Sequence, residues 1–281
     1  MPEERKPSFG KYVVKEIVGT GGVGRVWRAF DPDLQVPVVI KELGGMRHDP
    51  RTVERFCQAG RIQSGWHHPN IGQVFEVCSD PPYVVMEDLG QRSLQSLTQA
   101  GESISLGRIV RILSQVCDGL TYLHRAGIVH RDMKPANIAL VEADTAKIVG
   151  LDLCKASSGS QTPTQVILGT IPYMSPEQIT SPLAVDGRTD LWALGVILFE
   201  VTQRNPPFPG PGDIQTMFHI VHSPPAPFGV LPPPIADRLA ALLTSALQKD
   251  PAMRIGTAGE FKTLLEDLLQ VVADAESIVF A

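Results

Sequence analysis

The first part of the chain alternates short apolar runs with glycines and turn residues. Val and Ile are frequent from Tyr12 to Leu43, where glycines at 19–24 and the tripeptide Asp31-Pro32-Asp33 interrupt them. This pattern predicts three short antiparallel strands. Two further strands are predicted at Val74–Val77 and Tyr83–Met86.

Helical periodicity appears once between these strands and then dominates the rest of the chain. Arg51–Trp66 has apolar or small residues at helical spacing and ends before His68-Pro69, so we expect one helix lying on the sheet. After the connector 87–90 the sequence predicts an α+β fold whose second part is mostly helical. The helices expected there are Leu106–Ala126, Asp190–Thr202, Ile214–His222, Ile235–Gln248 and Ala258–Val272.

Composition narrows the class of protein. The 281 residues are 43% hydrophobic and 20% charged, as in an ordinary core-forming chain. A net charge of -5 argues against nucleic acid as the main partner. No apolar run reaches the roughly 18 residues of a membrane helix, and the start lacks a signal-peptide core. The scattered cysteines suit a reducing compartment, so we expect a cytoplasmic protein.

Two motifs in the β-rich part favour phosphate binding. Gly19, Gly21 and Gly24, followed by Val26, lie between two predicted strands, where glycines let a hairpin fold closely over phosphates. A simple turn is the alternative reading of such a cluster. Lys41, at the end of the next strand, favours the phosphate interpretation because it supplies a cation beneath the loop.

The string His130–Asn137 (HRDMKPAN) carries the most specific chemistry. It resembles the catalytic loop of eukaryotic-type protein kinases at every defining position. The resemblance implies that Asp132 accepts the proton of the attacking hydroxyl, that Lys134 neutralises the transferring phosphoryl group and that Asn137 holds a magnesium ion. Lysine at position 134 resembles the serine/threonine branch of the family.

Further residues extend the resemblance over about Phe9–Leu269. Glu177, Asp190 and Arg254 match architectural positions of the family, where the glutamate and the arginine form an ion pair. The resemblance implies a two-lobed, protein-kinase-like fold. We assign residues 1–8 to an N-terminal extension, 9–86 to the N-lobe, 87–91 to the hinge, 92–270 to the C-lobe and 271–281 to a tail.

By the same resemblance, the chain has an ATP pocket with altered walls. Val39 replaces the usual alanine above the adenine, and Ala139 replaces a larger residue below it. Volume-conserving exchanges of this kind are often tolerated. Met86 is expected to guard the back of the pocket, and the backbone of Glu87 and Leu89 to meet the adenine edge.

The pattern breaks at Gly150. The family has Asp-Phe-Gly where this chain has Gly150-Leu151-Asp152, so the metal-holding carboxylate is missing, which argues against Mg or Mn binding. A unit charge about 4 Å from its partner is worth about 4 kcal/mol at an effective dielectric near 20, or on the order of a thousandfold in rate. Asp152 is a metal ligand only if it substitutes for Gly150, which requires Leu151 to leave its core position.

A second break lies in the first helix. Ala59 stands where the family has the glutamate that pairs with the strand lysine, so we expect Lys41 to lack that partner. Glu54 lies about 140° around the helix and cannot stand in without a change of register. Gln58 would do so only if the alignment shifts by one residue. Gln63 places a polar group where the family packs an apolar one.

Two functions follow from these observations. One is a pseudokinase that works as a signalling scaffold or regulator, with weak or no nucleotide binding. The other is an active or weakly active serine/threonine kinase that transfers the γ-phosphate of ATP to protein hydroxyls. In both, the partners are proteins, and homo-oligomerisation stays open. Thr162 and Thr164 lie in an activation-segment-like stretch, where a phosphate could pair with Arg131.

Overall fold

The computed structural model describes residues 7–21, 24–44, 49–100, 104–151, 170–229, 231–274 and 279–280. They form two compact units, one ending at Gly90 and the other beginning at Gln91. Asp152, Thr162 and Thr164, for which roles were predicted above, lie outside the described residues.

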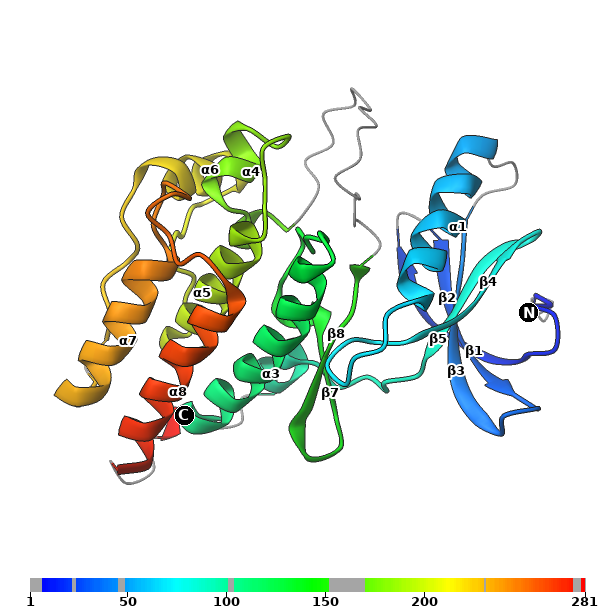
Figure 1. Cartoon of the computed structure of the whole chain (residues 1–281), viewed down its shortest axis with the longest axis horizontal. Coiled ribbons are helices and arrows are strands. Elements are labelled where there is room, and N and C mark those ends of the chain that lie inside the picture. The colour runs from blue at the N-terminus through cyan, green and yellow to red at the C-terminus, as the bar shows by residue number, and fades with distance from the viewer. Residues whose placement is uncertain are drawn as a thin grey trace. The chain divides into compact units, whose positions relative to one another are not determined.

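The first unit is built on a five-stranded antiparallel sheet with the strand order β1-β2-β3-β5-β4 (Figure 1). Asp31 makes the turn between the second and third strands, since its carboxylate accepts hydrogen bonds from the backbone of Asp33 and Leu34. The strands are β1 Val13–Gly21, β2 Gly24–Asp31, β3 Val36–Glu42, β4 Val74–Ser79 and β5 Pro82–Glu87.

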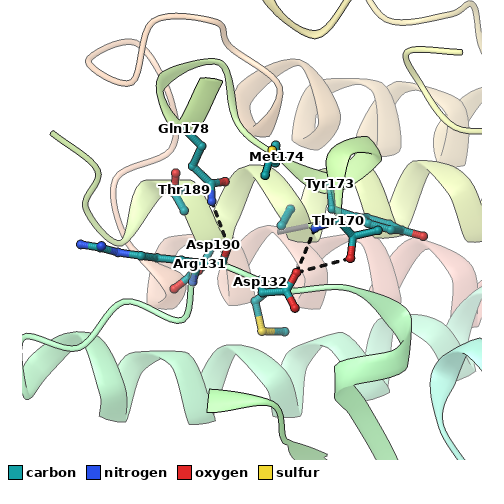
Figure 2. Close-up of a pocket in the computed structure, with 10 residues that line it drawn as sticks. Arg131, Asp132, Thr170, Tyr173, Met174, Gln178, Thr189 and Asp190 are labelled. Carbon is teal, nitrogen blue, oxygen red and sulfur yellow. Dashed lines mark hydrogen bonds between the residues drawn. The ribbon is translucent and has the colours of Figure 1, made fainter. Parts of the chain in front are cut away.

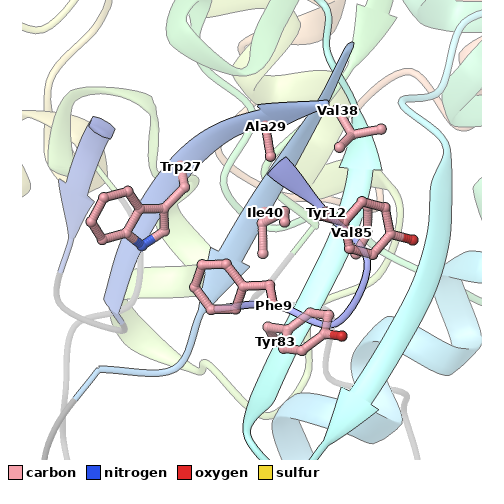
Figure 3. Close-up of a cluster of buried hydrophobic side chains, with 8 residues drawn as sticks. All are labelled: Phe9, Tyr12, Trp27, Ala29, Val38, Ile40, Tyr83 and Val85. Atoms are coloured by element: carbon pink, nitrogen blue, oxygen red, sulfur yellow. The ribbon is translucent and has the colours of Figure 1, made fainter. Parts of the chain in front are cut away.

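One face of this sheet carries an apolar cluster (Figure 3). Val38 and Ile40 of β3 are 0% exposed, and Phe9, from the segment before β1, lies over them with its ring 5.2 Å from that of Tyr83. Because successive strand residues point to opposite faces, Val39 and Lys41 belong to the other face. The remaining cluster members are Tyr12, Trp27, Ala29 and Val85.

Helix α1 (Pro50–Ser64) covers that other face. It packs on β4 and β5, with Cys57 and Gly60 buried. A Cβ atom on Gly60 would lie 2.8 Å from Val77 and 2.9 Å from Val84, so the helix approaches the sheet closely there. Val84 is the cross-strand neighbour of Lys41, which places α1 on the lysine's face.

The second unit is mainly helical. Helix α3 (Leu106–Arg125) packs along α8 (Ala258–Asp274), and α5 (Arg188–Gln203) is buried over most of its length (Figure 1). No helix in the described ranges is long and apolar enough to cross a membrane. The other α-helices described are α2 Leu94–Gln99, α4 Pro176–Thr180, α6 Asp213–His222 and α7 Pro233–Ala246. Two short strand pairs complete the unit: β6 Ile104–Ser105 with β9 Val279–Phe280, and β7 Ile138–Val141 with β8 Thr145–Ile148.

These two units confirm the predicted α+β, two-lobed kinase-like fold. The first holds the antiparallel sheet with its single long helix, and the second holds the remaining helices, as the hydrophobic pattern predicts.

Candidate functional site

Four of the predicted nucleotide-binding residues in the first unit share one face of the sheet. Val26 lies opposite Lys41 across β2 and β3, and Val39 lies opposite Met86 across β3 and β5. Cross-strand neighbours point to the same side of a sheet. The strand register therefore brings a cation and three apolar side chains together beside α1.

The glycines flank the turn between β1 and β2. Gly19 and Gly21 lie in β1, and Gly24 begins β2. A Cβ atom on Gly24 would lie 1.8 Å from the carbonyl oxygen of Glu42, so only glycine fits there. At Gly19 the same atom would meet nothing closer than 3.7 Å, so that position has room for a side chain.

The expected hinge residues are fixed by local hydrogen bonds. The backbone N–H of Glu87 donates to the carbonyl oxygen of Gln73 at 2.9 Å, and the Gln73 N–H donates to the Glu87 carboxylate at 3.2 Å. Asp88 forms an ion pair with Arg28 at 2.9 Å. Leu89 is half-buried.

Helix α1 supplies no acidic residue for Lys41 at the expected position. Ala59 is half-buried, whereas Glu54 and Gln58 are exposed, and neither of these two forms a side-chain hydrogen bond or ion pair within the described residues. Lys41 nevertheless makes a polar or electrostatic interaction, so it is not without a partner. Gln63 is half-buried and has an interaction of its own.

In the second unit, Asp190 holds the backbone of the catalytic loop. Its side chain is 0% exposed and accepts hydrogen bonds from the backbone N–H groups of His130 (2.9 Å) and Arg131 (2.8 Å) and from the His124 ring (2.8 Å). Arg131 has φ +66°, a conformation that costs free energy for a residue with a side chain. The Gln178 side chain donates to the Arg131 carbonyl at 2.9 Å, so this backbone is held from both sides (Figure 2).

The carboxylate of Asp132 is surrounded by donors. Lys134 Nζ lies 2.8 Å from one oxygen, and the Thr170 backbone N–H donates to the other at 3.1 Å (Figure 2). Asn137 Nδ2 donates to the Asp132 carbonyl at 2.7 Å and to its carboxylate at 3.2 Å. Lys134 also donates to Thr170 Oγ1 at 2.8 Å. The structure thus joins the three predicted catalytic residues in one network and adds Thr170.

Gly150 follows the β7–β8 hairpin, whose pairing brings it beside Asn137. The N–H of Val149 donates to the Asn137 carbonyl at 3.0 Å, and Ala139, the predicted lower wall of the adenine site, is buried in β7. Gly150 has φ +79°, and a Cβ atom there would lie 2.6 Å from Asn137 Oδ1 and 2.7 Å from its Cγ. Leu151 is 4% exposed and so keeps its core position.

The described side chains around Asn137 and Gly150 do not offer the ligands that a divalent cation needs. Mg²⁺ requires near-octahedral oxygen ligands that usually include one or two carboxylates. Position 150 offers none, and Asp132 is committed to Lys134, Thr170 and Asn137. Within the described ranges no group of three or more His, Cys, Asp or Glu residues is placed to hold a metal. Among the described residues of this site, one neutral amide oxygen, that of Asn137, remains, and Asp152 lies outside them.

A buried ion pair supports the loop from α4. Arg254 forms two hydrogen bonds with Glu177, at 2.6 and 2.9 Å, and the Arg254 side chain is 0% exposed. Burial alone raises the pKa of Glu177, but the bonds and charge of Arg254 outweigh it and hold that pKa below its usual value. Thr189 of α5 adds a 3.0 Å hydrogen bond to the same carboxylate.

Sequence reasoning gave no role to Thr170 or Gln178. Thr170 follows the activation-segment-like stretch that contains Thr162 and Thr164, and no motif marks its side chain. Gln178 directly follows Glu177, and only its contact with the strained Arg131 backbone reveals its role.

Comparisons with known proteins show the family of this chain. Residues 12–268 match the family described as "Protein kinase domain". The chain is 32% identical over 278 residues to "Probable serine/threonine-protein kinase SCO3848" of Streptomyces coelicolor, covering 95% of this chain and 41% of that protein. It is 31% identical over 271 residues to "Serine/threonine-protein kinase PknB" of Mycobacterium tuberculosis, covering 93% of this chain and 43% of that protein.

A third relative, "Serine/threonine-protein kinase PknA" of Mycobacterium tuberculosis, is 32% identical over 261 residues, covering 90% of this chain and 60% of that protein. The chain thus spans less than two thirds of the length of each of these relatives. The family match covers both structural units and includes the Asp132 network. The chain belongs to the protein kinase domain family.

Proposed function

We propose that this chain is a pseudokinase, a kinase-family domain that acts on protein partners as a signalling scaffold or regulator. The observation that carries the proposal is position 150, which has no carboxylate and whose side-chain space is taken by Asn137. Kinases transfer phosphate with metal ions that neutralise the developing charge. Without a metal ligand at this position, nucleotide binding is weak or absent and transfer is slow.

The altered first helix supports the same proposal. Ala59 cannot pair with a lysine, and the nearest acidic residue of α1, Glu54, is exposed. Positioning of the nucleotide phosphates by Lys41 is therefore less constrained than in a kinase with the helix glutamate. The proposed ATP contacts are the face of the sheet that carries Val26, Val39 and Lys41.

The test is a radiolabelled phosphotransfer assay with Mg²⁺ and with Mn²⁺, on the protein itself and on a generic protein substrate. We expect equal background incorporation for the natural chain and for Asp132→Asn. Transfer that Asp132→Asn abolishes would sink the proposal. A thermal-shift titration with ATP, with and without metal, tests nucleotide binding separately, because a ligand that binds the folded state raises Tm.

The second candidate is an active serine/threonine kinase, and the network around Asp132 favours it. Asp132, Lys134 and Asn137 are hydrogen-bonded to one another, and Lys134 lies beside Thr170. The curated relatives bear serine/threonine kinase names. Under this reading the substrate is a protein hydroxyl group.

Regulation by phosphate is proposed for either function. The Nε of Arg131 is buried and has no hydrogen-bond partner in the described part of the chain. A guanidinium whose Nε lacks an acceptor can bind an incoming anion. A phosphate on Thr162 or Thr164 is the proposed partner, and mass spectrometry of native protein that finds neither threonine phosphorylated contradicts it.

A further inference from the structure

In this structure the side-chain amide of Asn137 lies where a side chain at position 150 would begin. The Cβ atom missing from Gly150 would lie within 3.0 Å of Asn137 Oδ1, Cγ and Nδ2. Real Cβ atoms essentially never approach other atoms so closely, so a Cβ atom at position 150 requires the Asn137 amide, the end of that side chain, to move. The amide of Asn137 therefore occupies the space of a residue-150 side chain.

From this overlap we infer that Asn137 acts here as a brace for Asp132 in place of a metal ligand, and that an aspartate at position 150 alone does not recreate a metal site. The inference deepens the proposed pseudokinase function. The carboxylate expected at position 150 and the Asn137 amide compete for one space, so an incoming side chain displaces the other oxygen ligand.

The hydrogen bonds of Asn137 hold Asp132 in place. Its Nδ2 donates to both the carbonyl (2.7 Å) and the carboxylate (3.2 Å) of Asp132. Lys134 supplies the balancing positive charge at 2.8 Å, and Thr170 supplies donors to the second oxygen at 3.1 and 3.4 Å. Both carboxylate oxygens thus have donors, and the Lys134 ammonium compensates the charge without a metal ion.

Gly127 provides a matched control. It has φ +73°, close to the φ +79° of Gly150, but a Cβ atom there would meet nothing within 4 Å. Replacing either glycine by alanine introduces the same backbone strain. Only Gly150→Ala adds a collision with Asn137, so the difference between the two variants isolates the overlap.

The first experiment is a double-mutant cycle read by thermal unfolding. We expect Gly150→Ala to lower Tm by several degrees more than Gly127→Ala, and the excess to vanish when Asn137→Ala is present. Asn137→Ser, which also clears the space, replaces Asn137→Ala if that variant does not fold. If Gly150→Ala unfolds and the double variant folds, the inference holds. The inference is overturned if Gly150→Ala lowers Tm equally with and without Asn137→Ala, or if Gly150→Ala and the double variant both fail to fold.

The second experiment counts bound Mn²⁺ by electron paramagnetic resonance. We expect Gly150→Asp to bind no more Mn²⁺ than the natural chain, and Asn137→Ala to leave any binding unchanged. A site gained in Gly150→Asp, or binding lost in Asn137→Ala, overturns the inference. Phosphotransfer that depends on Asp132 would contradict the pseudokinase proposal. Additive effects on Tm at positions 137 and 150 would contradict only the role of Asn137 as a brace.

Discussion

The catalytic loop and helix α1 both depart from the kinase pattern, yet they accommodate the change by different means. In the loop, polar groups close on one another: Asn137 fills the space at Gly150 and binds Asp132. In α1 the contact with the sheet is apolar, because Gly60 lets the helix approach Val77 and Val84.

The difference follows from what each region buries. A buried charge that loses its partner is costly, and around the loop the carboxylates of Asp132 and Glu177 are paired with Lys134 and Arg254. A small residue on a helix leaves no unpaired group when the helix moves closer to its sheet. The stability of the loop should therefore depend on its ion pairs. The stability of α1 should depend on the volume of the side chains that it packs against the sheet.

Glu177→Ala, beside the loop, tests this difference with the largest expected effect. Arg254, whose side chain is 0% exposed, would lose both of its bonds to that carboxylate. Removing one partner of a buried pair costs about 3 to 5 kcal/mol. Denaturant unfolding should show this loss, and Asp118→Ala, which breaks the more exposed pair with Lys262, should cost less than about 1 kcal/mol. Equal losses would mean that burial does not decide the effect.

Gly60→Val tests the volume side of the comparison. Its Cβ alone would lie 2.8 Å from Val77, and both partners are stiff β-branched residues. Overpacking of this kind costs about 1 to 3 kcal/mol. The matched control is Gln58→Val on the same helix, which is exposed and should cost less than about 0.5 kcal/mol. A tolerated valine at position 60 would show that α1 does not depend on close approach.

The strongly periodic elements could be predicted from the sequence, and the short ones could not. The helix predicted at Leu106–Ala126 is found at Leu106–Arg125, and that at Ile214–His222 at Asp213–His222. Helices α2 and α4 have only 6 and 5 residues, too few to show a helical period.

The chemistry of the site could be predicted only in part. The HRDMKPAN string identified the residues around Asp132, because their roles are tied to a contiguous motif. The overlap of Asn137 with Gly150 could not be predicted, since it depends on the β7–β8 pairing and on a few tenths of an ångström.

Gln178→Glu measures a single bond of the loop. Glutamate keeps the oxygen that accepts from the Ser175 N–H at 3.0 Å but loses the donor to the Arg131 carbonyl. We expect a loss of about 1 to 2 kcal/mol in the free energy of unfolding, because that carbonyl then faces a carboxylate. Gln178→Met removes both bonds and should cost at least as much. A stable Gln178→Glu variant would show that Asp190 alone holds the strained Arg131.

The smallest expected effect is a pH dependence at Lys249. This residue donates to the Ile220 carbonyl at the end of α6, and its Nζ lies 3.7 Å from the centre of the Phe208 ring. Burial, followed by the nearby charge of Arg254, lowers the Lys249 pKa from 10.5 to about 8. Between pH 8 and 10 the unfolded chain then holds more protons at this site than the folded one, so stability should rise with pH.

Lys249→Met isolates that contribution. From pH 8 to 10 the natural chain should gain on the order of 1 kcal/mol relative to Lys249→Met, because solvent at this half-exposed site screens the charge. Lys262→Met is the control: Asp118 raises the Lys262 pKa, so both states stay protonated across the same range and no gain is expected. If the difference in unfolding free energy between the natural chain and Lys249→Met does not change with pH, the α6 carbonyl and the aromatic ring fully offset the desolvation of the ammonium. A charged group would then stabilise α6 as well as the catalytic loop.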